Sequence, residues 1–161
     1  MNTEKNIKTL VVKKPLKLDC GKTINNFPVA FETYGSLNEN KDNAILVFHA
    51  LTGDQFVTGL NPVTKKDGWW SFAVGPDKAI DTNKYFVICS NVIGGCMGSY
   101  GPSHKDPETQ KTFGTDFPVI TINDMVNAFT MSLIVITGKS CLLYTSPSPR
   151  DATLSRMPSS A

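Results

Sequence analysis

The chain has 161 residues, of which 40% are hydrophobic and 19% charged, which is typical of a soluble globular domain with a real core. A net charge of +2, from 16 basic and 14 acidic residues spread along the chain, excludes an electrostatic footprint for nucleic acid or an anionic membrane. The polar N-terminus, the absence of a long apolar run, four cysteines without a C-x-x-C pair and two isolated histidines predict a cytoplasmic protein with reduced thiols and no metal site.

Two strands are predicted first. Residues 7–18 mix β-branched and polar side chains, and residues 28–34 alternate apolar with polar ones. Turn residues stand between them, at Gly21 and at the pair Asn25-Asn26. We therefore expect the fold to open with an antiparallel pair of strands.

Two further strands have the composition of buried parallel strands. Residues 43–49 and 85–91 are nearly continuous apolar runs bounded by polar residues. Between them, residues 69–73 are predicted to form a short amphipathic helix that ends at Gly75-Pro76. This order of elements predicts a parallel pair joined by a crossover.

The last third of the chain changes character. Residues 94–102 read as a glycine-rich surface loop, and a capping box predicts a helix that begins near Thr121. Residues 133–136 resemble a strand. We therefore divide the chain into a domain portion at 1–128 and an atypical tail at 129–161, whose Ser- and Pro-rich end is expected to be disordered or artefactual.

Four motifs, in this order, closely resemble homoserine O-acetyltransferases of the α/β-hydrolase superfamily: F-E-T-Y-G at 31–35, H-A-L-T-G-D at 49–54, G-W-W at 68–70 and N-V-I-G-G-C-M-G-S at 91–99. The resemblance covers roughly residues 17–128. It implies a truncated α/β-hydrolase fold, in which opening antiparallel strands are followed by parallel strands of the central sheet.

The resemblance also implies an activity. The parent enzyme would use serine to move an acetyl group from acetyl-CoA to the hydroxyl of L-homoserine, a step of methionine biosynthesis, with acetyl-CoA as substrate and no bound cofactor. It leaves open a succinyl donor, a serine acceptor and a homodimeric parent.

One turn carries the predicted site. A buried strand that ends in small residues exposes backbone N–H groups at the carboxyl edge of a parallel sheet. The resemblance places an oxyanion-hole donor at the N–H of Leu51 and assigns Ala50, Thr52 and Gly53 to the substrate pocket. The alternative is a plain turn at the end of a strand.

Other residues receive structural interpretations. His49 precedes any plausible nucleophile, whereas the α/β-hydrolase histidine follows its serine, so we interpret His49 as structural. The loop at 94–101 is expected to support the active site. Trp69, Trp70 and Phe72 are interpreted as packing residues and not as a ligand cage.

The sequence contains no G-x-S-x-G nucleophile elbow. Ser90, Ser99 and Ser103 lack the required pair of glycines, residues 138–141 provide only half an elbow, and no histidine follows Ser140. We therefore expect an inactive N-terminal fragment of an acyltransferase. The alternatives are a binding protein that uses an exposed sheet edge and an esterase of the same superfamily.

Overall fold

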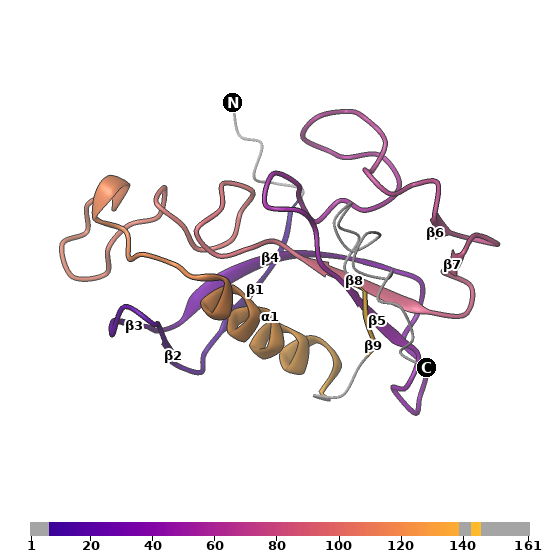
Figure 1. The fold of residues 1–161 in the computed structure, drawn as a ribbon, viewed down its shortest axis with the longest axis horizontal. Coiled ribbons are helices and arrows are strands. Elements are labelled where there is room, and N and C mark those ends of the chain that lie inside the picture. Colours follow the sequence, from indigo (N-terminus) through magenta and orange to yellow (C-terminus); the bar gives the residue numbers. More distant parts are fainter. Residues whose placement is uncertain (1–6, 139–142, 146–161) are drawn as a thin grey trace, which may run out of the picture.

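The computed structural model describes residues 7–138 and 143–145, which form a mixed sheet with one long helix on one face (Figure 1). The sheet has the order β1-β4-β8-β5-β9. Its strands are β1 (Lys8–Val12), β4 (Phe27–Tyr34), β5 (Ala44–Val47), β8 (Phe86–Ser90) and β9 (Leu143–Thr145). The pairs β1·β4 and β4·β8 are antiparallel, and β5 runs parallel to both β8 and β9. The predicted change from antiparallel to parallel strands is confirmed.

The opening strands differ in one detail from the prediction. The single strand expected over residues 7–18 is two strands, β1 and β2 (Leu16–Lys17). Pro15 lies at the break and has no N–H to donate to a ladder. The second strand pairs with β3 (Thr23–Ile24) in a separate two-stranded sheet.

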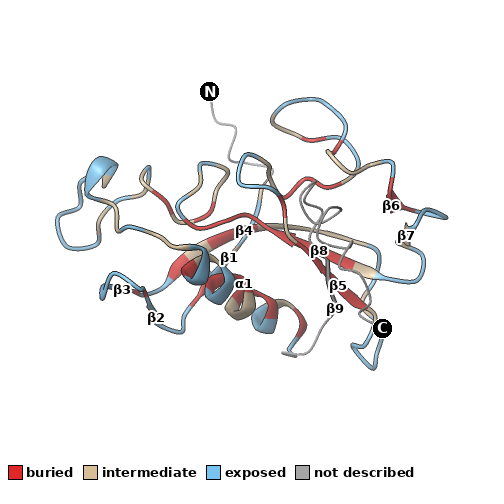
Figure 2. Ribbon diagram, in the orientation of Figure 1, coloured by how far each residue is buried: buried red, intermediate tan, exposed pale blue. Residues whose placement is uncertain are grey.

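Strands β5 and β8 are the most buried among the sheet strands whose burial the structure describes (Figure 2). All four residues of β5 are buried, and the strand pairs with β8 in the register Ile45 to Val87. Alternate side chains serve two cores: Ile45 and Val47 pack toward the crossover, whereas Leu46 packs with Leu133 of the helix. Burial on both faces explains why these strands read as continuous apolar runs.

The crossover from β5 to β8 contains no helix among its described residues. It consists of turns and the short parallel strands β6 (Val74–Gly75) and β7 (Ile80–Asp81). The helix predicted at 69–73 is wrong, because tertiary hydrogen bonds compete for that segment. The N–H of Trp70 donates to the carbonyl of Val57 at 2.8 Å, and five residues are too few for a stable helix.

Helix α1 (Ile122–Thr137) begins where the sequence predicts. Its capping box is complete, since the Thr121 side chain accepts from the N–H of Asp124 and the Asp124 side chain accepts from the N–H of Thr121. The strand-like interpretation of residues 133–136 is wrong, because Leu133 and Ile136 lie on the helix face that packs on the sheet. The helix ends at Gly138, whose φ is 72°.

The predicted boundary after residue 128 falls inside α1. Residues 139–142 and 146–161 lie outside the described residues, so the disorder expected for the end of the chain stays a prediction. A one-turn 3₁₀-helix, η2 (Gly114–Asp116), precedes α1. No helix in the described part of the chain is long and apolar enough to cross a membrane.

Candidate functional site

A turn after β5 carries the predicted site residues at the carboxyl end of the parallel strands. The N–H of Gly53 donates to the carbonyl of Ala50 at 2.7 Å, which closes the turn. Leu51, at its tip, is 71% exposed. The N–H of Leu51 has no acceptor among the residues that the structure describes, so it is free to donate to a ligand.

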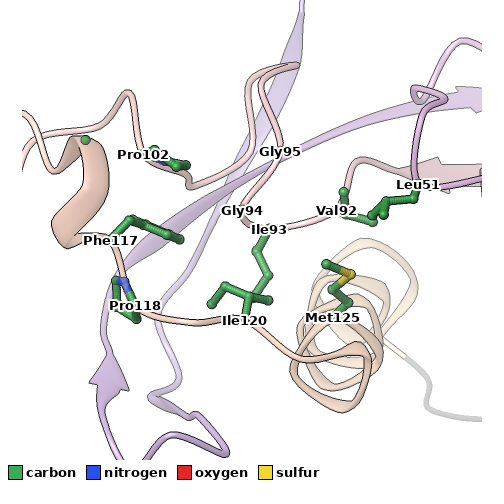
Figure 3. A pocket seen from close by; sticks show the side chains of 11 residues that line it. Leu51, Val92, Ile93, Gly94, Gly95, Pro102, Phe117, Pro118, Ile120 and Met125 are labelled. Atoms are coloured by element: carbon green, nitrogen blue, oxygen red, sulfur yellow. The ribbon is translucent and has the colours of Figure 1, made fainter.

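A cavity of about 460 Å³ lies beside this turn, and Leu51 lines it (Figure 3). In Figure 3, Leu51 lies next to Val92, which follows β8, and Met125 of α1 lies below them. Phe117 and Pro118, in the segment before α1, form the opposite wall. The side chains that line the cavity are apolar, which suits an acyl group better than a charged group.

Only one of the four predicted site residues lines this cavity. Ala50, Thr52 and Gly53 lie in the adjoining turn and are not part of its wall. Ile120 and Met125 also line the cavity, although the sequence did not indicate them as site residues. The capping box at Thr121 was the available signal, because it places the start of a helix, and hence Met125, at a defined point.

His49 is buried directly before the turn. Its Nδ1 lies 2.7 Å from the carbonyl oxygen of Ala50, and its Nε2 lies 3.4 Å from Nδ2 of Asn91. Burial lowers the pKa of His49 below its ordinary value, and the hydrogen bond to the Ala50 carbonyl and the nearby charge of Asp54 oppose this shift only in part. The ring is therefore expected to be neutral near pH 7, and both of its nitrogens contact groups of the protein.

The glycine-rich loop after β8 is fixed to the sheet. Ser99 is buried; its hydroxyl donates to the carbonyl of Asn91 at 2.8 Å and accepts from the N–H of Ala30 at 2.9 Å. The side chain of Gln55 donates to the carbonyl of Met97 at 3.2 Å. These contacts fix the loop that follows the cavity wall at Val92–Gly95. That the loop supports an active site stays a prediction.

The aromatic residues of the crossover behave in two ways. Trp69 and Trp70 stack with ring centroids 5.8 Å apart and pack against the core next to β5. The indole N–H of Trp69 donates to the carbonyl of Asp54 at 2.9 Å. Phe72 is 81% exposed, so its interpretation as a packing residue is wrong.

No group of three His, Cys, Asp or Glu side chains in the described ranges is placed to hold a metal ion.

No family model matches the chain. Individual relatives do: the homoserine O-acetyltransferase of Pelagibacter ubique is 76% identical over 128 residues, which cover 80% of this chain and 34% of the relative. The enzyme of the same name from Nitrobacter hamburgensis is 62% identical over 118 residues, 73% of this chain and 30% of the relative. Over these residues, the chain belongs to the homoserine O-acetyltransferase family. It spans about a third of the length of these curated relatives.

Solved structures confirm the fold of this member of the homoserine O-acetyltransferase family. The homoserine O-acetyltransferase from Bacillus anthracis superposes with a TM-score of 0.77 at 32% identity, over 89% of this chain and 40% of that structure. Esterase E22 superposes with a TM-score of 0.75 at 32% identity, over 88% of this chain and 41% of that structure. The described residues form part of an α/β-hydrolase fold, as predicted. This fold serves both acyl transfer and ester hydrolysis.

Proposed function

We propose that the protein to which this chain belongs transfers an acetyl group from acetyl-CoA to the hydroxyl of L-homoserine, in the cytoplasm, as a step of methionine biosynthesis. The observation that carries the proposal is the 76% identity to the Pelagibacter ubique homoserine O-acetyltransferase over 128 residues. The exposed turn beside an apolar cavity supports it, since both are features that an acyl-transfer site requires.

The proposed contribution of this chain is one oxyanion donor and part of the substrate pocket. The N–H of Leu51 would donate to the oxygen that becomes negative in the tetrahedral intermediate, a contact worth about 3 kcal/mol in the transition state. Ala50, Thr52 and Gly53 would shape the pocket entrance from the turn. The nucleophile has to come from a serine elbow that the 161 residues do not contain. We therefore expect the chain alone to show no acetyl transfer.

The wall chemistry favours an acetyl donor over a succinyl donor. No charged side chain is among the residues that line the cavity in the described part of the chain. A succinyl group would bring a carboxylate against apolar side chains without a cationic partner, which costs free energy.

An esterase is the second candidate, because esterase E22 superposes as well as a transferase does. A binding protein that uses an open sheet edge is less well supported. No observation favours it: β5 is paired with β9, and the outer strands of the described sheet are β1 and β9.

The experiment uses a chimaera, in which the aligned 128 residues of this chain replace their counterparts in the Pelagibacter ubique relative. Release of CoA from acetyl-CoA is measured with and without L-homoserine, and again with succinyl-CoA. We expect rapid release only with acetyl-CoA and L-homoserine together. Release that does not need L-homoserine would identify an esterase. The unmodified relative is the positive control. The 161-residue chain alone is the negative control and should release no CoA.

A further inference from the structure

The carbonyl oxygen of Ala50 is held by two hydrogen bonds. It lies 2.7 Å from Nδ1 of the His49 ring and 2.7 Å from the backbone nitrogen of Gly53. A carbonyl oxygen only accepts, so both nitrogens must carry a proton. The short contact to the ring therefore requires the Nδ1–H form of His49.

This carbonyl shares a rigid peptide unit with the N–H of Leu51. No peptide bond between described residues is cis. In a planar trans peptide, the C=O of one residue and the N–H of the next point in opposite directions. Fixing the carbonyl of Ala50 therefore fixes the direction of the Leu51 N–H, which points away from the His49 ring.

The other side of the ring meets the side-chain amide of Asn91. Nε2 of His49 lies 3.4 Å from Nδ2 of Asn91, in a contact buried from solvent. With the proton on Nδ1, Nε2 is an acceptor and the Asn91 amide is its donor. The backbone of Asn91 is held in turn, because its N–H donates to the carbonyl of Ala30 at 2.7 Å and its carbonyl accepts from the hydroxyl of Ser99 at 2.8 Å.

We propose that His49 is a positioning residue that aims the Leu51 N–H at the reacting acyl oxygen, and that Asn91 holds it in the Nδ1–H form. The proposal rests on the proposed function, because it needs Leu51 to be the oxyanion donor. It assigns a role in acyl transfer to a histidine that is not the general base, which in this fold follows the nucleophilic serine in the sequence. The ring exchanges no proton with substrate and acts only through the Ala50–Leu51 peptide.

The first test measures the ring directly in the 161-residue chain. Nitrogen chemical shifts of His49 by NMR distinguish Nδ1–H, Nε2–H and the imidazolium. We expect the Nδ1–H form at pH 7, with protonation only below the ordinary range, because burial lowers the pKa of the ring. Asp54 is the carboxylate whose charge acts in the opposite direction. A dominant Nε2–H form would overturn the proposal.

The second test compares His49→Asn with His49→Gln in the chimaera. The Asn amide nitrogen stands where Nδ1 stood, whereas the Gln amide is one bond farther out. We expect His49→Gln to lose roughly 30- to 100-fold in kcat, with KM changed by less than about threefold, because an aimed oxyanion donor acts only in the transition state. We expect His49→Asn to retain kcat within about fivefold, because its amide can still donate to Ala50.

A merely structural role predicts the opposite order. Gln fills more of the buried space than Asn, so His49→Gln should be the more stable variant. If His49 were only structural, kcat would follow stability and also favour His49→Gln. The positioning role predicts that kcat favours His49→Asn. Equal kcat losses in the two variants, or losses that follow melting temperature, would contradict the positioning role and leave the proposed function standing. A chimaera inactive before any His49 change, beside an active relative, would overturn the proposed function and this role with it.

Discussion

Burial decides the chemistry of two side chains around the site. His49 and Cys89 both lie at the ends of the central parallel strands, where water is excluded. Burial lowers the pKa of the histidine and raises the pKa of the thiol, in each case by disfavouring the charged form. The nearby charge of Asp54 also raises the pKa of the Cys89 thiol. Neither group is therefore expected to carry charge near pH 7.

The thiols provide a prediction at this scale. Cys20 and Cys96 are exposed, whereas Cys89 is buried in β8. Because the thiolate is the reactive form and Cys89 neither ionises readily nor meets solvent, we expect iodoacetamide to alkylate Cys20 and Cys96 and to spare Cys89 at pH 8.

Peptide mass spectrometry after a short labelling time measures the alkylated fraction of each cysteine. The same reaction in urea, where all cysteines should react, is the control. Labelling of Cys89 at the rate of Cys20 in the native protein would show that β8 does not form the core.

At the scale of elements, α1 connects the opening of the fold to the cavity. The buried carboxylate of Asp124 accepts from the N–H of Thr121 at 2.9 Å and from the N–H of Asp19 at 3.0 Å. One side chain thus caps the helix and ties it to the loop after β2. Since Met125 is the next residue and lines the cavity, this tie also places part of the wall.

We predict that Asp124→Ala lowers the free energy of unfolding by about 2–3 kcal/mol, because it leaves two N–H groups without their acceptor. Asp116→Ala is a matched control, since Asp116 is exposed in η2, and should change stability by less than about 0.5 kcal/mol. Urea unfolding followed by circular dichroism measures both. Equal effects of the two substitutions would contradict the assigned cap.

At the scale of the whole molecule, the sheet is built outward from β8. This strand pairs with β4 on one side and β5 on the other, and both of its faces are covered. The long loops at the carboxyl end of the strands carry the site. The buried central strands therefore support the exposed loops that carry the site.

The rates of amide hydrogen exchange should follow the burial of the strands. We predict that the amides of Val87, Ile88 and Cys89 exchange more slowly than those of the largely exposed residues 105–112, because local opening follows burial and pairing. Strand β1, which pairs only with β4 among the described strands, should exchange at an intermediate rate. Time-resolved amide exchange by NMR measures all three. Faster exchange in β8 than in β1 would contradict this architecture.

The sequence by itself determined the elements whose signals are local. The apolar runs at residues 43–49 and 85–91 predict buried strands, and the capping box at Thr121 predicts the start of a helix. The order of four short motifs was enough to indicate the family. Each of these signals lies within a few neighbouring residues and needs no knowledge of what packs against them.

The tertiary structure alone decided the rest. The pattern of residues 133–136 fits a strand or a helix, and packing of Leu133 against the sheet selects the helix. Residues 69–73 do not form the predicted helix, because this segment is hydrogen-bonded to Val57. The contact between His49 and Asn91 joins residues 42 positions apart. Such contacts depend on how strands are ordered in space, and a short apolar run or a single polar residue does not encode its distant partner.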